Sequence, residues 1–124
     1  MIRNRTLAVL AGAALTSLAA PAQAQMYEKI SVTNSTGYTI AEIYMSPSRT
    51  YDWEEDILGR DLLDDGGVVE IDFRRSVETC DWDLKVVYGD GEEAVWDRLD
   101  LCEDWQFELF YNARSGDTHL TSSH

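Results

Sequence analysis

Two cysteines, Cys80 and Cys102, enclose the stretch that most constrains the fold of this chain. Between them, residues 81–88 and 92–101 flank the short connection Gly89-Asp90-Gly91. Glycine tolerates positive φ and aspartate forms local hydrogen bonds, so this connection predicts a tight antiparallel hairpin. Folding the stretch about residue 91 places the two cysteines opposite each other and predicts three further cross-strand pairs. These pairs are Val87 with Val95, Val86 with Trp96, and Lys85 with Asp97.

Residues 1–24 have the composition of a cleaved secretory signal. Arg3 and Arg5 precede an apolar run over residues 7–20, and Pro21-Ala-Gln-Ala24 has the small-x-small pattern of a signal peptidase site. The run is short and alanine-rich for a membrane span, which needs about 20 strongly apolar residues. An uncleaved anchor is the alternative. We expect one exported domain over residues 25–124, located in the periplasm or secreted.

The cysteine pair is expected to form a disulfide, because export would place it in an oxidising compartment. Closing a loop of about 20 residues is worth roughly 3 kcal/mol in the chain-entropy account. That is a large share of the roughly 5 to 10 kcal/mol expected for a domain of this size. A zinc site is disfavoured, because His119 and His124 are the only histidines that could complete a four-ligand set.

Acidic residues outnumber basic ones by 23 to 10, which gives a net charge of -13. The expected signal contains two of the basic residues and no acidic residue, so the exported part would carry -15. Such a surface repels nucleic acid and anionic lipid. The expected partners are therefore cations, basic proteins or neutral ligands, and we expect a monomer. Alternatively, the charge serves only solubility.

Short stretches with strand-like patterns alternate with turn residues along the rest of the chain. Besides the hairpin, strands are predicted over residues 27–33, 38–45, 68–73 and 105–111. Six or seven short strands, without a helix of ordinary length, predict an antiparallel β-sandwich. A small β-barrel is the alternative.

Three local expectations accompany this fold. The first two strands, over residues 27–33 and 38–45, are expected to pair as a hairpin. Residues 52–58 can form one helical turn capped by Asp52. The tail over residues 112–124 is expected to fray, with one further short strand at its centre as an alternative.

Several motifs are distributed along residues 34–91. They are Asn34-Ser-Thr-Gly-Tyr-Thr-Ile40, Ser46-Pro-Ser48, Trp53-Glu-Glu-Asp-Ile-Leu-Gly59, Cys80-Asp-Trp-Asp-Leu-Lys85 and Gly89-Asp-Gly91. Together they resemble a family of small exported bacterial proteins of unknown function, and the third motif is the most specific. The resemblance covers most of residues 25–124 and implies a β-rich exported protein.

Some members of that family carry the name argininosuccinate lyase through automated naming. That enzyme is a long, helical, cytoplasmic tetramer, and its Gly-Ser-Ser catalytic loop is absent from this sequence. We therefore do not expect lyase activity here.

The longest irregular stretch runs from Ser46 to Gly67 and supplies the candidate ligand or partner loop. Its candidate residues are Ser46, Ser48, Asp52, Trp53, Glu54, Glu55, Asp56 and Asp61. Carboxylates are hard oxygen ligands suited to calcium, which makes Asp52, Glu54 and Asp56 the candidate metal ligands. The spacing does not fit an EF-hand, because the required glycine is missing after Asp56. We expect no other cofactor.

Aromatic residues beside carboxylates raise the alternative of carbohydrate binding. Trp82, Trp96 and Trp105 lie in predicted strands and are expected in the core. Trp53 lies in the loop and is the candidate for an exposed stacking platform.

Catalysis has little support in the sequence. Ser46, Ser48 and Ser76 have no surrounding motif, and no histidine has a fixed place from which to act as a base. A small hydrolase using loop carboxylates such as Glu54 and Asp56 remains as an alternative. The expected function is a non-catalytic binding or interaction module of the cell envelope, with a calcium- or carbohydrate-binding module as the other alternative.

Overall fold

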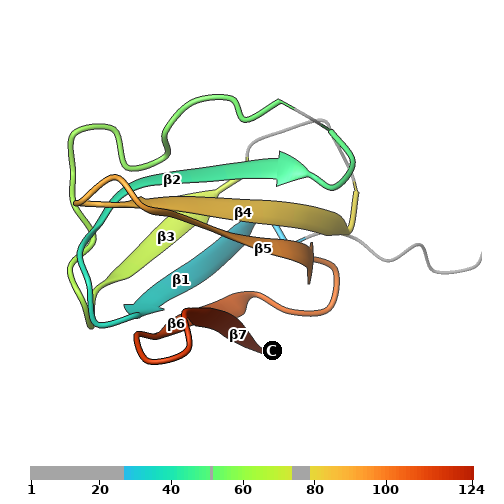
Figure 1. Cartoon of the computed structure of the whole chain (residues 1–124). Coiled ribbons are helices and arrows are strands. Elements are labelled where there is room, and N and C mark those ends of the chain that lie inside the picture. The colour runs from blue at the N-terminus through green and yellow to red at the C-terminus, as the bar shows by residue number, and fades with distance from the viewer. Residues whose placement is uncertain (1–26, 51, 74–78) are drawn as a thin grey trace, which may run out of the picture.

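The computed structural model describes residues 27–50, 52–73 and 79–124, and this part of the chain is built from strands without a helix (Figure 1). The strands are β1 (Lys29–Ser35), β2 (Ile40–Pro47), β3 (Val68–Asp72), β4 (Asp81–Tyr88), β5 (Glu93–Asp100), β6 (Gln106–Asn112) and β7 (Asp117–Ser123). They form a four-stranded sheet in the order β3-β1-β6-β7 and a three-stranded sheet in the order β2-β4-β5. The two sheets confirm the predicted β-sandwich. The described strands do not close into a barrel.

The predicted secretory signal and Ser76 lie outside the described residues. Within the described ranges, no helix is long and apolar enough to cross a membrane.

The core lies between the two sheets and follows the alternation of the strands. In β4, Trp82, Leu84 and Val86 are buried while the residues between them are partly exposed. Phe107 and Leu109 of β6 are buried in the same way from the other sheet. Successive side chains of a strand point to opposite faces, so each sheet turns one apolar face inward.

The expected hairpin of the first two strands is wrong, because β1 and β2 belong to different sheets. Buried Asn34 directs the chain from one sheet to the other. Its Nδ2 donates to the carbonyls of Tyr38 at 2.8 Å and Leu63 at 2.9 Å, and its Oδ1 accepts from the Thr36 backbone N–H at 3.0 Å. Gly37, with φ of 84°, provides the left-handed residue of this corner.

β1 lies between β3 and β6 in the four-stranded sheet. It pairs antiparallel with β3 and parallel with β6, so the sandwich is not antiparallel throughout. Glu70 and Asp72 of β3 point outward, whereas Ile71 is buried, as the alternation of this segment predicts.

A register shift in β2 explains its irregular pattern of apolar residues. The pairing with β4 slips between Ile40 and Glu42. Consequently Ile40, Ile43 and Met45 are all buried, although a regular strand would place Ile40 on the opposite face.

The β4–β5 hairpin is confirmed, but its predicted register is wrong by two residues. Lys85 pairs with Val95, and Leu84 pairs with Trp96. The cause lies in the turn, where the Gly91 N–H donates to the Tyr88 carbonyl at 2.9 Å and the Tyr88 N–H to the Glu92 carbonyl at 2.8 Å.

The disulfide between Cys80 and Cys102 is confirmed, with the two Cα atoms 5.1 Å apart. A bulge adds one residue to β5 between the pairs Leu84–Trp96 and Trp82–Leu99, where Arg98 has φ of 57°. The chain then turns over residues 101–103, so Cys102 meets Cys80 beyond the end of the ladder. A disulfide fits a protein outside the reducing cytoplasm.

Three smaller expectations are corrected. Residues 52–58 form no helix; residues 52–56 are irregular, and a turn follows over residues 57–60. The tail is not frayed, because β7 pairs with β6 along its length. Trp82 and Trp96 are buried as expected, but Trp105 is 37% exposed at the entry to β6.

Candidate functional site

The connection from Asp52 to Leu63 runs along the outer edge of β2 (Figure 1). The Ile57 N–H donates to the Ile43 carbonyl at 2.7 Å, while Ile40 and Leu63 exchange backbone hydrogen bonds of 2.9 Å. Asp56 completes the attachment, since its Oδ1 accepts from the backbone N–H of Ile43 at 2.9 Å and of Leu58 at 3.0 Å. The connection thereby covers part of an edge that would otherwise be open to pairing.

The same connection forms one wall of a cleft of about 410 Å³, here called the acidic cleft. The cleft lies where the end of β2, the end of β3 and the start of β4 meet. Its polar lining consists of six carboxylates together with Ser46 and Thr50, and its apolar lining of the remaining residues. The carboxylates are Asp52, Glu54, Glu55, Asp56, Glu70 and Asp72, and the apolar residues are Met45, Pro47, Ile57, Ile71, Phe73 and Trp82.

Four of the six apolar lining residues, Met45, Ile71, Phe73 and Trp82, belong to the hydrophobic core. Phe73 and Trp82 lie with their ring centroids 4.9 Å apart, and Trp82 Nε1 donates to the Thr79 carbonyl at 2.9 Å. Met45 and Ile71 are less than a tenth exposed. The cleft therefore combines carboxylates with an apolar surface formed mainly by core residues.

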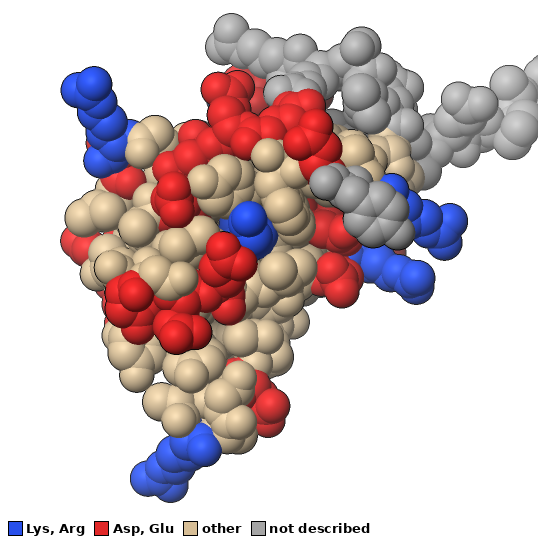
Figure 2. All heavy atoms as spheres, turned by 45° about the horizontal axis from the view of Figure 1, so that its top comes forward, with Lys and Arg blue, Asp and Glu red and all other residues tan. Residues whose placement is uncertain are grey.

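Negative charge predominates in the described lining of the acidic cleft. Figure 2 shows acidic side chains gathered across the face that carries the connection. Among the described residues that line the cleft there is no lysine or arginine. Clefts lined by one sign of charge raise the local concentration of oppositely charged ligands, so the described lining favours cations.

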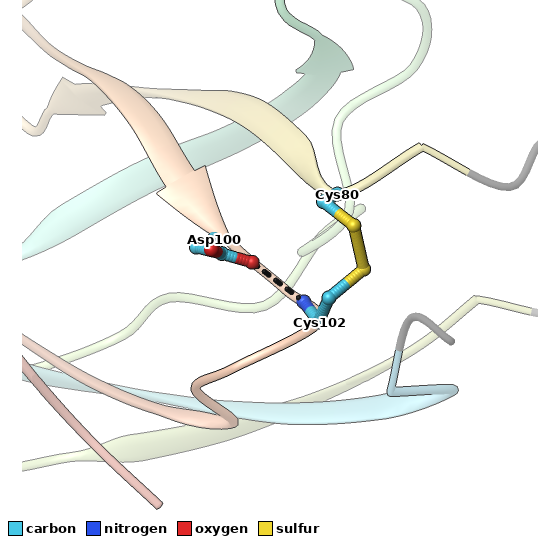
Figure 3. Close-up of side chains that lie close together, drawn as sticks. All are labelled: Cys80, Asp100 and Cys102. Carbon is cyan, nitrogen blue, oxygen red and sulfur yellow. Dashed lines mark hydrogen bonds between the residues drawn. A yellow bond between two sulfur atoms is a disulfide. The ribbon is translucent and has the colours of Figure 1, made fainter. Parts of the chain in front are cut away.

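The carboxylates are spread out and do not converge on one point. In the described ranges, the one group of three side chains with ligand atoms within 4.8 Å of one another is Cys80, Asp100 and Cys102. The sulfurs of that group are bonded to each other, and Asp100 Oδ1 accepts from the Cys102 backbone N–H at 2.9 Å (Figure 3). Asp52, Glu54 and Asp56, the candidate calcium ligands, form no such group among the described residues.

Five of the predicted loop residues line the acidic cleft, and three do not. The five are Ser46, Asp52, Glu54, Glu55 and Asp56. Ser46 is only 2% exposed and Asp56 supports the backbone, so both help to hold the wall in place. Asp52, Glu54 and Glu55 are exposed.

The remaining predicted residues, Ser48, Trp53 and Asp61, lie outside the cleft. Ser48 Oγ donates to Asp83 Oδ1 at 2.6 Å, and the same oxygen accepts from the Arg98 N–H at 3.1 Å. Ser48 therefore supports the bulge between β4 and β5. Asp61 is exposed and directly follows the turn over residues 57–60.

Trp53 is half-buried rather than presented as an open platform. The ammonium of Lys85 lies 5.3 Å from the centroid of the Trp53 ring and 4.7 Å from that of Tyr44. This arrangement holds Trp53 against the outer face of the β2-β4-β5 sheet. Tyr44 Oη donates to Glu42 Oε1 at 3.0 Å, and this bond is the main cause that raises the pKa of Tyr44.

The sequence analysis did not identify Glu70 and Asp72 as site residues, although both carboxylates line the cleft. They lie on β3, which reaches the cleft because it pairs with β1. The alternation of the predicted strand placed both carboxylates on its outer face. That pattern does not identify the segment that lies opposite them.

The histidines are remote from the acidic cleft. His119 of β7 stacks on Phe110 with centroids 4.5 Å apart, and His124 Nδ1 lies 3.3 Å from Asp104 Oδ1. Neither residue lines the cleft that contains Ser46.

Comparisons with known proteins extend the description of the fold. No family model and no curated protein matches this chain. A solved structure, the NMR structure of a protein from Eubacterium rectale, is similar with a TM-score of 0.56 and 11% sequence identity. The match covers 86% of this chain and 95% of the other. At this identity the likeness shows a shared fold alone.

Proposed function

We propose that this protein is an exported, non-catalytic binding module whose acidic cleft takes a basic segment of a partner protein. The observation that carries the proposal is the meeting of six carboxylates, from the Asp52–Leu63 connection and from β3, around an apolar interior. A lysine or arginine side chain has the matching chemistry, because its aliphatic stem packs on apolar surface while its charged end remains at the rim.

Export is part of the same proposal. The signal-like composition of residues 1–24 supports it, and so does the disulfide, which fits an oxidising compartment. Expression in a bacterial host and mass measurement of the periplasmic protein test this part. We expect a chain that lacks residues 1–24 and has lost two hydrogens through the disulfide. A full-length chain in the cytoplasmic fraction would contradict export.

A charge-neutralised variant tests the binding site. A labelled peptide of alternating lysine and leucine serves as the probe, and fluorescence anisotropy follows its binding at low salt. We expect the triple variant Glu54→Gln, Glu55→Gln, Glu70→Gln to bind about tenfold more weakly than the unmodified protein. A peptide with glutamate in place of lysine should not bind.

A second triple variant controls for net charge. Asp97→Asn, Glu103→Gln and Asp117→Asn remove the same charge from exposed positions outside the acidic cleft. We expect this variant to keep most of its affinity. Equal losses in both variants would show non-specific attraction and refute the site. Calcium should leave the melting temperature unchanged, and a calcium-dependent rise would favour a metal site instead.

A further inference from the structure

Lys85 holds together two aromatic rings that come from different parts of the chain. Tyr44 is its cross-strand neighbour in β2, whereas Trp53 belongs to the Asp52–Leu63 connection. The ammonium lies 4.7 Å from the centroid of the Tyr44 ring and 5.3 Å from that of the Trp53 ring. An ammonium within about 6 Å of a ring centroid is attracted to the face of that ring. Lys85 therefore joins the connection to the β2-β4-β5 sheet.

Trp53 lies in the part of the connection that supplies carboxylates to the acidic cleft. Asp52 and Glu54 are its direct neighbours in the sequence, and both line the cleft together with Glu55. These three acidic residues are exposed, whereas Trp53 is half-buried. Among these four consecutive residues, Trp53 is the one that packs against the sandwich.

Backbone hydrogen bonds hold the chain on either side of Trp53. The Thr50 N–H donates to the carbonyl of the last residue of β2 at 3.1 Å, and the Ile57 N–H donates to the Ile43 carbonyl at 2.7 Å. Between these two attachments, the ring of Trp53 contacts the ammonium of Lys85. The contact therefore supports the stretch that carries the exposed carboxylates.

We propose that Lys85 is a positioning residue for the acidic cleft. Through Trp53 it holds Asp52, Glu54 and Glu55 in the arrangement that takes a basic segment, so the inference rests on the function proposed above. Lys85 itself is not among the residues that line the cleft. It acts on the wall of the cleft and does not touch the ligand.

The positive charge of Lys85 makes this role testable by the direction of an effect. Removal of a positive charge from a protein that attracts a basic ligand should strengthen binding, if charge alone matters. Under the positioning role, the same removal weakens binding, because the carboxylates lose their fixed place. The two explanations therefore predict changes in affinity of opposite sign.

The variant Lys85→Met keeps a long side chain and removes the charge. We expect it to bind the labelled lysine–leucine peptide about threefold more weakly in the anisotropy measurement at low salt. Lys85→Arg should keep the affinity, because a guanidinium also packs on aromatic rings. Trp53→Leu should show the same loss as Lys85→Met. The double variant should lose no more than either single one, because both changes break the same contact.

Arg114→Met is the matched control for charge. Arg114 is exposed in the turn between β6 and β7 and does not line the acidic cleft. Its removal changes the net charge by the same amount as Lys85→Met. We expect this variant to bind the peptide as well as the unmodified protein or slightly better.

A measurement on the free protein tests the role of Lys85 without any peptide. NMR relaxation reports the motion of the backbone amides of residues 52–55 on the picosecond to nanosecond timescale. We expect greater mobility of these amides in Lys85→Met and in Trp53→Leu. Lys85→Arg and Arg114→Met should leave their mobility unchanged.

The two measurements separate this inference from the proposed function. Tighter peptide binding by Lys85→Met, or unchanged mobility of residues 52–55 in that variant, would overturn the role of Lys85. Absence of peptide binding by the unmodified protein would instead refute the proposed function of the cleft. In that case the relaxation measurement alone still decides whether Lys85 positions the wall.

Discussion

Asn34 Nδ2 donates to the carbonyl oxygen of Leu63 at 2.9 Å, across 29 positions of the sequence. The bond ties the corner that ends β1 to the end of the connection that covers β2. Both residues are buried, and Asn34 is fully enclosed. This hydrogen bond therefore links the corner where the chain passes from one sheet to the other with the position of the Asp52–Leu63 connection.

Replacement of Asn34 by alanine should therefore be strongly destabilising. It would leave the Leu63 carbonyl without its side-chain donor and the Thr36 N–H without its acceptor, and it would remove one of the two side-chain donors to the Tyr38 carbonyl. We expect a loss of about 2 to 4 kcal/mol in the free energy of unfolding, measured by urea denaturation. Asn112→Ala is the control, since Asn112 caps an exposed turn through the Arg114 N–H. A loss no larger than that of the control would contradict the role assigned to Asn34.

Removal of the disulfide should lower stability without changing the fold. For the double variant Cys80→Ser, Cys102→Ser, we expect a loss of about 3 kcal/mol, because the open chain gains conformational entropy when unfolded. Urea denaturation measures the loss, and circular dichroism should show the same strand content. The unmodified protein under reducing conditions should match the variant. Unchanged stability in both would show that the bond contributes little.

Gly67 should not tolerate a side chain. A Cβ at this position would lie 2.9 Å from both the Asp64 carbonyl oxygen and Leu63 Cδ1. The backbone oxygen has little freedom to move, so Gly67→Ala should cost about 1 to 3 kcal/mol. In Gly89→Ala the nearest atom, the Thr39 carbonyl oxygen, would be 4.0 Å away, and we expect a far smaller effect. Thermal unfolding of the two variants provides the comparison, and similar melting temperatures would refute it.

Alkaline pH should destabilise the protein in part through Tyr88. Burial raises the pKa of Tyr88 in the folded state above its ordinary value of 10.0, so the unfolded chain releases this proton first as the pH rises. The unfolded state then binds fewer protons, and stability falls from about pH 10 upward until the folded state also ionises. In Tyr88→Phe this fall should be smaller. Urea midpoints at increasing pH measure it, and identical slopes would contradict the prediction.

The strands were predictable from the sequence because each of them has only two faces. Ile30 and Val32 alternate with polar residues, and so do Ile71 and Phe73, and all four side chains are buried. Sheet membership was harder to infer. A corner such as that at Gly37 either reverses the chain within one sheet or leads it into the other sheet. The outcome here depends on the hydrogen bonds of Asn34, and one of its partners, Leu63, lies 29 positions away.

The hairpin shows a different limit. The cysteine pair was identified correctly although the register used to align it was wrong. The bulge at Arg98 and the turn after Asp100 add the residues that bring Cys102 to Cys80. A pattern of side chains does not reveal a bulge, because an exposed arginine is compatible with either geometry.

The candidate sites were only partly predictable for the same reason. The carboxylates of the Asp52–Leu63 connection are adjacent in sequence, so their grouping was expected. Glu70 and Asp72 join them through the pairing of β3 with β1. The rings of Tyr38, Tyr88 and Tyr111 form one cluster although the residues are far apart in the sequence. No local sequence motif predicts such a cluster.

The central place of β1 has a consequence for how the chain folds. Its residues 31–35 pair in parallel with residues 106–110, so the four-stranded sheet cannot be completed until nearly the whole chain is available. Long-range pairing of this kind makes folding slow compared with helical proteins of similar length. A chain that emerges from its N-terminus during synthesis remains without the β1–β6 pairing until β6 appears, and this delay is compatible with the export proposed above.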